Sequence, residues 1–170
     1  VYQNFGAEWI PPELREGMNE WEIMQAGEIP YLVKDEDLRG TIHNHSTYSD
    51  GKNTLKEMAE AAKNLGLEYL GISDHSKSAF YANGLDESRI LQQHEEIDKL
   101  NEELAPFKIF KGIESDILND GSLDYNDDVL SSFDFIVASI HSGLSMDERK
   151  ATSRLINAIE NPYTTFLGHP

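Results

Sequence analysis

The chain has 170 residues, 39% of them hydrophobic, and this size and composition fit a single globular domain with a sizeable core. It contains no cysteine, which excludes disulfides and thiolate chemistry and leaves His, Asp and Glu as the side chains for any metal site. No apolar run approaches the roughly 18 residues of a membrane span, and the first residues lack the basic and apolar regions of a signal peptide, so we expect no membrane contact and a cytoplasmic location.

The formal net charge of −17 sets a condition on any partner. An acidic chain repels phosphate groups unless bound divalent cations offset its charge locally. Acidity can also serve solubility alone. The charge therefore neither identifies a partner nor excludes one.

Residues 1–39 differ from the rest of the chain. They contain three of the six prolines and both tryptophans, without a clear strand alternation. Pro11 and Pro12 suit the start of a helix, and we predict a short helix within Glu13–Ala26. We interpret 1–39 as an N-terminal arm or linker and 40–170 as the folded domain.

From Arg39 onward, short apolar runs alternate with helical patterns. The predicted strands are Gly40–His43, Tyr69–Ser73, Lys108–Ile113, Asp134–Ile140 and Thr164–Leu167. Strands that alternate with helices predict an α/β fold built on a parallel sheet or barrel.

The predicted helices lie between these strands. The first follows the capping box Thr54-x-x-Glu57 and stops at Gly66, and the last opens at Ser145-x-x-Glu148 and ends before Pro162. Asn126–Ser131 holds one or two turns. The helix over 87–104 is predicted to bury one face, made of Ile90, Leu91, Ile97, Leu100 and Leu104, and to leave His94 in solvent.

Histidines gather at one end of the predicted strands. Five of the six histidines stand at or just beyond the carboxyl end of a strand, namely His43, His45, His75, His141 and His169. In parallel α/β folds that end of the sheet carries the active site. The grouping therefore predicts a shared site, although a single histidine at such a position is usually structural.

The neighbouring residues fit metal chemistry. His43 and His45, two apart on a strand, would present both imidazoles on one face. Glu114 ends the third strand with a carboxylate that can bridge two ions, and Asp74 could orient a ligand. Asp50 before Gly51 would, on its own, be interpreted as a turn former. Mixed histidine and carboxylate ligands favour Mn²⁺, Zn²⁺ or Fe²⁺ over Ca²⁺ or Mg²⁺ alone.

A second acidic run, from Asp116 to Asp127, partly resembles a calcium-binding loop. Leu118 stands where an oxygen ligand is needed, and Asp127 stands where a bidentate glutamate is usual. We therefore reject calcium binding there.

At these positions the chain resembles the PHP (polymerase and histidinol phosphatase) superfamily. The matching motifs are His43-x-His45 with Ser49-Asp50-Gly51, Ser73-Asp74-His75, Gly112-Ile-Glu114, Ala138-Ser-Ile-His141 and Gly168-His169-Pro170. Further segments resemble the C-terminal PHP domain of bacterial family X DNA polymerases: Trp9–Gly17, Asp37–Gly40, Asp74–Lys77, Ala82–Asp86, Gly121–Asp124 and Ala158–Pro162.

The resemblance implies a distorted TIM-like (β/α)7 barrel, of which this chain carries about the first five βα units. It implies up to three divalent metals (Mn, Zn or Fe). The implied ligands are His43, His45 and Glu114 for one ion, Glu114, His141 and His169 for a second, and Asp50 and His75 for a third. A late Asp-x-His motif of the family has no match here. We therefore expect a C-terminally truncated domain over 40–170, with an open edge that another copy could pair with.

The implied chemistry is the hydrolysis of a phosphate ester. A metal-bound water beside His43, His45, Glu114 and His141 would attack phosphorus, and Lys77, Ser76 and Ser142 are candidate phosphate contacts. We expect a 3′–5′ exonuclease or abasic-site endonuclease that acts on DNA beside an upstream repair-polymerase domain. The alternatives are a phosphatase for a phosphorylated small molecule, such as histidinol phosphate, and an inactive structural module of a polymerase.

Overall fold

The structure is a computed structural model that describes residues 4, 6 and 9–169. The chain divides into two compact units, Val1–Asp37 and Leu38–Pro170. Pro170, the end of the predicted Gly-His-Pro motif, lies outside the described residues, as does part of the predicted arm. The function of 1–39 as an arm or linker stays a prediction.

The first unit is built from short helical segments. They are the 3-10 turn η2 (Pro12–Leu14), the helix α1 (Glu20–Ala26) and the 3-10 turn η3 (Asp35–Asp37). The helix predicted within Glu13–Ala26 therefore occupies only the second half of that range. Gly17 has a left-handed φ of +70°, and its N–H donates to the Glu20 carboxylate at 2.9 Å. This turn separates η2 from α1 and fixes the point where α1 begins.

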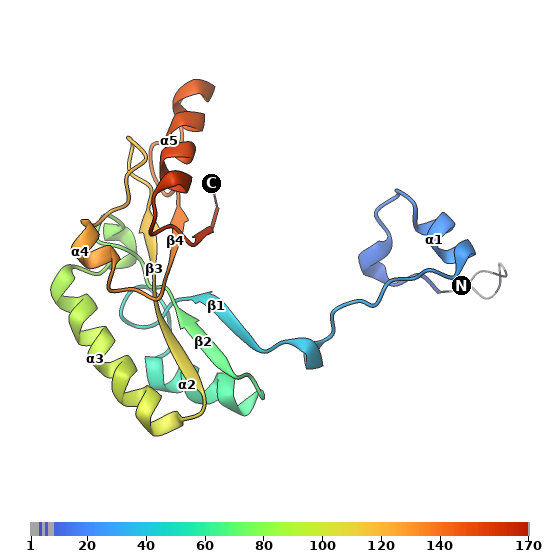
Figure 1. Cartoon of the computed structure of the whole chain (residues 1–170), viewed down its shortest axis with the longest axis horizontal. Helices are drawn as coiled ribbons and strands as arrows, with labels where there is room; N and C mark the ends of the chain where they lie inside the picture. Colours follow the sequence, from blue (N-terminus) through green and yellow to red (C-terminus); the bar gives the residue numbers. More distant parts are fainter. Residues whose placement is uncertain (1–3, 5, 7–8, 170) are drawn as a thin grey trace. The chain divides into compact units, whose positions relative to one another are not determined.

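The second unit is an α/β half-barrel. Its strands are β1 (Gly40–Asn44), β2 (Tyr69–Ile72), β3 (Lys108–Asp116), β4 (Phe135–Ser139) and β5 (Phe166–Leu167). All neighbours pair in parallel, in the order β1-β2-β3-β4-β5. The sheet curls as half of a barrel does, which confirms the predicted fold class (Figure 1).

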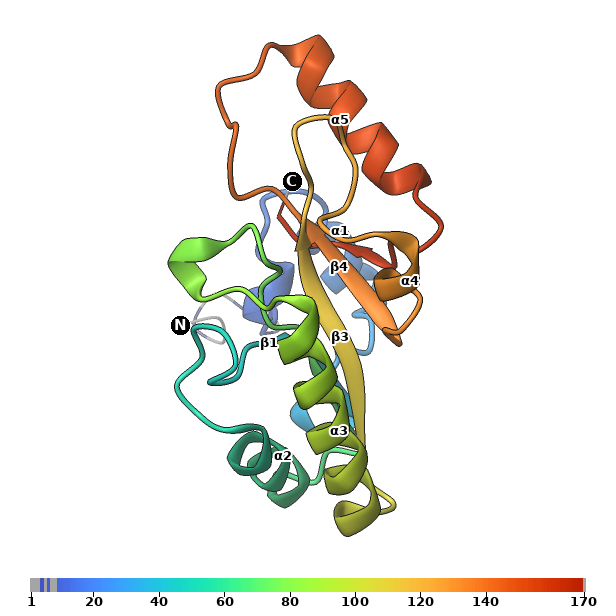
Figure 2. The same cartoon turned by 90° about the vertical axis from the view of Figure 1, so that its left-hand side faces the viewer.

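Four α-helices connect these strands. They are α2 (Leu55–Asn64), α3 (Glu87–Leu104), α4 (Asp127–Leu130) and α5 (Glu148–Glu160). Figure 2 shows α3 lying along β3. The Thr54–Glu57 capping box is present, as predicted. The capping box predicted at Ser145 is wrong, because Asp147 caps α5 by accepting from the N–H of Lys150.

The helices bury two apolar clusters against the sheet. One joins α2 and α3 to β2 and the first half of β3, and the other joins α3, α4 and α5 to β3 and β4. The predicted face of α3 needs a correction, since Leu91 is 65% exposed whereas His94 is buried. The buried face follows Ile90, Gln93, His94, Ile97 and Leu100, a helical spacing of three and four residues.

The opposite face of the sheet is shaped by two glycines. A Cβ on Gly112 would lie 2.2 Å from the Phe135 ring, and one on Gly71 would lie 2.9 Å from it. Phe135 can therefore cross over β3 and β2 on this face.

None of the helices that the structure describes has both the length and the apolarity to span a membrane.

Candidate metal centre

The side chains predicted from the strand ends meet in the second unit. His43 and Glu114 lie within β1 and β3, and the others follow the strands: His45 and Asp50 after β1, His75 after β2, His141 after β4 and His169 after β5. Parallel strands place these carboxyl ends on one edge of the sheet. The structure thus brings all seven predicted metal ligands to one place.

Glu114 is the centre of this group. It is 1% exposed, and all five imidazoles face its carboxylate. Its Oε1 lies 3.0 Å from Nε2 of His43, 3.0 Å from Nε2 of His169 and 3.4 Å from Nε2 of His141. Its Oε2 lies 3.2 Å from Nδ1 of His75 and 3.4 Å from Nε2 of His45.

Three sets of side chains have the spacing of metal ligands. They are His43, His45 and Glu114; His45, Asp50 and His75; and His75, Glu114 and His141, each with ligand atoms within 4.8 Å of one another. The first set coincides with the predicted first ion. The second adds His45 to the predicted pair, and the third contains His75 where His169 was predicted. His169 remains adjacent, with Nε2 3.2 Å from Nε2 of His141.

His43 reaches this position through its backbone. It has a φ of +64°, a left-handed value that non-glycine residues rarely adopt, and the pairing of β1 with β2 shifts register between Thr41 and Asn44. Both imidazoles face Glu114, as predicted, but regular strand alternation does not place them there. The local irregularity brings the two rings together, with centroids 5.5 Å apart.

The donor atoms fit bound divalent metal ions. Three of the predicted ligands have a buried side-chain atom without a hydrogen-bond partner: Nδ1 of His45, Nδ1 of His75 and Oε1 of Glu114. Such atoms are costly unless something binds them. Burial lowers the pKa of His75, which favours the neutral imidazole that coordinates metals. Burial alone would raise the pKa of Glu114, but Ser139 and the surrounding histidines lower it overall, which favours the carboxylate.

Asp74 supports the loop that carries His45 and Asp50. Its carboxylate is fully buried and accepts from the backbone N–H and the hydroxyl of Ser46, at 2.7 and 2.6 Å. It also accepts from the N–H and hydroxyl of Ser49, and from the Gln93 amide at 2.6 Å. Asp74 therefore holds the loop after β1 against the end of β2 and against α3.

Asp116 is a functional candidate that the sequence argument missed. It is 4% exposed, and its Oδ1 lies 2.5 Å from Nδ1 of His141 while Oδ2 accepts from the Ser78 hydroxyl at 2.9 Å. A carboxylate on Nδ1 keeps the proton there and turns Nε2 toward the centre. The available signal was the spacing, because Asp116 is two residues after Glu114 on β3 and shares its face.

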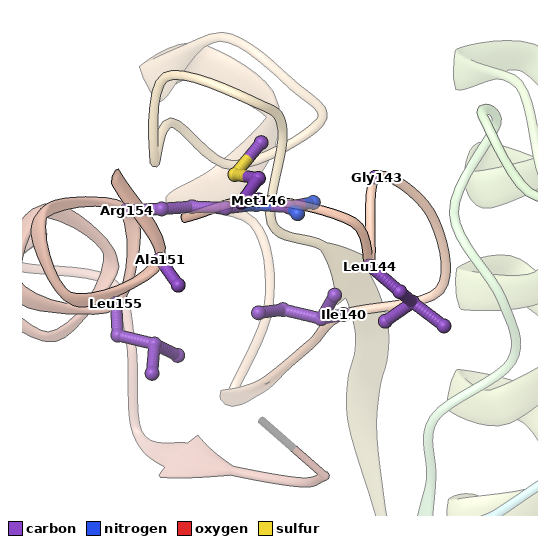
Figure 3. Close-up of a pocket in the computed structure, with 7 residues that line it drawn as sticks. All are labelled: Ile140, Gly143, Leu144, Met146, Ala151, Arg154 and Leu155. Carbon is purple, nitrogen blue, oxygen red and sulfur yellow. The ribbon is translucent and has the colours of Figure 1, made fainter. Parts of the chain in front are cut away.

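Arg154 of α5 fixes the backbone just after Asp116 and just after His141. It is 2% exposed and donates to the carbonyl oxygens of Ile117, Leu118 and Ser142, the last two at 2.9 and 2.8 Å. Its side chain lines an apolar pocket of about 220 Å³ between α5 and the loop after β4, together with Ile140, Gly143, Leu144, Met146, Ala151 and Leu155 (Figure 3). The segments that carry Asp116 and His141 are thus tied to α5.

The predicted phosphate contacts have other partners. The hydroxyl of Ser76 is buried and accepts from the N–H of Asp116 at 2.9 Å. The ammonium of Lys77 pairs with Glu87 at 2.8 Å, and the carbonyl of Ser142 binds Arg154. Their contact with phosphate stays a prediction.

Comparison with known proteins agrees with this geometry. A family model described as "PHP domain" matches residues 41–163. The "DNA polymerase/3′-5′ exonuclease PolX" of Bacillus subtilis (strain 168) is 44% identical over 99% of this chain and 29% of that protein. A probable phosphatase of Thermoanaerobacter sp. (strain X514) is 31% identical over 75% of this chain and 52% of its own length. One from Caldicellulosiruptor saccharolyticus is 34% identical over 69% of this chain and 48% of its own length. The chain therefore spans about half of these phosphatases, or less than a third of the polymerase.

Proposed function

The chain belongs to the PHP domain family, and we propose that it is the metal-dependent phosphoesterase unit of an enzyme that hydrolyses phosphodiester bonds of DNA. The proposed reaction is removal of 3′-terminal nucleotides or incision at abasic sites, beside an upstream polymerase domain. The observation that carries the proposal is Glu114, a buried carboxylate surrounded by five imidazoles with unmatched polar atoms among them.

The residues of the centre have separate tasks in this proposal. The seven residues would hold divalent ions (Mn, Zn or Fe), and such ions would supply an acidified water molecule and neutralise charge on the phosphoryl oxygens. Burial lowers the pKa of His75, which favours its neutral form. Asp116 keeps the proton of His141 on Nδ1, and Asp74 fixes the loop that presents His45 and Asp50.

The choice of DNA rests on where the relatives match. The relative named as a polymerase and exonuclease matches 99% of the chain, which includes the first unit, whereas the probable phosphatases match 75% and 69% of it. The names of the phosphatases favour a second candidate, a phosphatase for a phosphorylated small molecule. The same ligands would serve both reactions, so the substrate has to be determined by assay.

The test compares two substrates in the presence of Mn²⁺. The intact protein is incubated with 5′-labelled DNA carrying either a free 3′ end or an abasic site, and in parallel with histidinol phosphate. The proposal predicts shortening or incision of the DNA, abolished by Glu114→Gln and retained by the matched variant Glu103→Gln, whose carboxylate is exposed and pairs with Lys56. Turnover of histidinol phosphate with intact DNA would establish the phosphatase instead. Metal binding without either activity would favour a structural module.

A further inference from the structure

Two exposed aromatic side chains stand on one short turn of the second unit. The 3-10 turn η4 (Phe80–Ala82) follows the loop after β2. Phe80 is 88% exposed and Tyr81 is 71% exposed, while the flanking Ala79 and Ala82 are 0% and 1% exposed. In Figure 2 this green turn projects from the body of the unit. The small residues anchor the turn and the large apolar ones face solvent, the reverse of what burial alone favours.

The turn is fixed by its own contacts. The N–H groups of Ala82 and Gly84 both donate to the carbonyl of Ala79, at 3.0 and 3.1 Å. Arg89 of α3 donates to the carbonyls of Asn83 and Gly84, at 2.8 and 3.1 Å. A Cβ on Gly84 would lie 1.8 Å from the carbonyl of Ser76, so only glycine allows this close approach. The two aromatic rings are therefore displayed on a well-supported backbone.

Tyr81 lies beside the metal ligands. Its ring centroid is 6.1 Å from that of His75 and 6.3 Å from that of His141, and both pairs meet edge to face. A phosphate at the centre would thus be near an exposed aromatic ring. Aromatic rings bind nucleobases by stacking and accept all four bases, because every base presents a π face.

The charge of the chain makes such a contact valuable. Asp and Glu number 31 against 14 Lys and Arg, and the ammonium of Lys77, close in sequence to the turn, is engaged by Glu87. Proteins that bind nucleic acid through many phosphates use lysine and arginine for this purpose. With acidic residues in excess and Lys77 paired with Glu87, contact with the bases offers a way to hold the substrate that does not depend on further phosphate contacts.

We propose that Tyr81, extended by Phe80, is a stacking platform that binds a nucleobase next to the phosphate positioned at the metal centre. The platform rests on the proposed function and specifies its substrate as single-stranded or frayed nucleic acid. It binds with little base preference. The phosphates outside the metal centre contribute little, so the KM changes weakly with salt.

The test measures kcat/KM of the intact protein on two short single-stranded oligonucleotides. One carries normal nucleotides at its 3′ end, and the other carries nucleotides there whose base is a saturated, non-aromatic ring, so that neither substrate contains an abasic site. Tyr81→Leu should lower the preference for the substrate with aromatic bases about 5- to 150-fold, the range expected for the loss of one stacked base. Tyr81→Trp should restore it, because the ring returns. Phe80→Leu should have a smaller effect in the same direction.

Leu91→Ala is the matched control, since Leu91 is an exposed apolar residue on α3 and should leave the preference unchanged. If Tyr81→Leu lowers kcat/KM by the same factor on both substrates, the proposal of a stacking platform is wrong. The ring would then act on the metal centre and not on the base. A wild-type protein that cleaves both substrates equally well would also overturn it, with the proposed function intact. Failure to cleave either DNA would contradict the proposed function itself.

Discussion

Two buried carboxylates at the ends of neighbouring strands differ in what surrounds them. Asp74, just after β2, accepts five hydrogen bonds from Ser46, Ser49 and Gln93. Glu114, in β3, is equally buried but faces imidazoles and keeps an oxygen without a hydrogen-bond partner. Burial of a charge is costly unless it is matched. The protein itself supplies hydrogen-bond donors to the charge of Asp74. The charge of Glu114 calls for a bound cation.

The comparison separates a structural carboxylate from a ligand. Both residues stand at the predicted active-site end of the sheet, so their place in the fold does not distinguish them. What distinguishes them is whether every carboxylate oxygen has a hydrogen-bond donor, as in Asp74, or one lacks a donor, as in Glu114. We therefore expect removal of Asp74 to lower stability and removal of Glu114 to lower metal binding.

The largest expected effect on stability is that of Asp74→Ala. The variant leaves the buried N–H groups of Ser46 and Ser49 without an acceptor, which should lower the free energy of unfolding by about 2–6 kcal/mol. Asp74→Asn should cost less, because its amide oxygen can still accept from both. Urea denaturation of the three proteins measures this. A loss below about 1 kcal/mol for Asp74→Ala would show that the loop does not depend on this carboxylate.

His94 extends the comparison to a buried group outside the metal ligands. Burial, reinforced by Lys111 and opposed by Asp98 and Asp134, lowers its pKa from the usual 6.5 to about 4. Between pH 6.5 and about 4, His94 is therefore mostly protonated in the unfolded chain and mostly neutral in the folded chain. This part of the stability is present above pH 6.5 and is lost as the pH falls toward 4, by roughly 3 kcal/mol.

The measurement is the free energy of unfolding of wild type and His94→Leu between pH 4 and 7. The difference between the two proteins should change across this window, in favour of the variant at low pH. A constant difference would mean that His94 titrates normally. The outcome also shows whether a perturbed histidine can be purely structural, since the ring of His94 packs on Phe133, with centroids 5.1 Å apart.

A smaller effect is expected at Asp116, which acts on the centre through His141. Asp116→Asn keeps the shape but weakens the hold on Nδ1 of His141, so the apparent affinity for Mn²⁺ should fall about 10- to 100-fold. Titration with Mn²⁺ measures this, with Asp120→Asn in an exposed loop as the control. If the affinity for Mn²⁺ is unchanged, the contact of Asp116 with His141 does not contribute to metal binding.

Much of the half-barrel follows from sequence patterns. The apolar runs predicted all five strands, and the Thr54–Glu57 box predicted the start of α2. Local patterns could do this because capping and strand burial depend on near neighbours. The start of α5 failed, since Ser145 and Asp147 are both good caps and only the folded loop selects Asp147.

The positions of the ligands were predictable but their geometry was not. Strand ends pointed to the five histidines and Glu114, and the family resemblance added Asp50. The left-handed backbone of His43 and the pairing of Asp116 with His141 depend instead on contacts between distant segments. His94 was missed for a related reason. Its exposure depends on which face of α3 meets Phe133, and the apolar residues of that helix permit more than one choice.

The central claim is that Glu114 is buried to hold metal ions. The direct measurement is Mn²⁺ binding by calorimetry in the intact wild-type protein, Glu114→Gln and Glu103→Gln. We predict that Glu114→Gln weakens binding by more than about 100-fold, beyond the loss expected for a supporting residue, with no loss of stability in the metal-free protein. Glu103→Gln should bind as wild type does. Wild-type affinity in Glu114→Gln, or its unfolding without metal, would contradict the account.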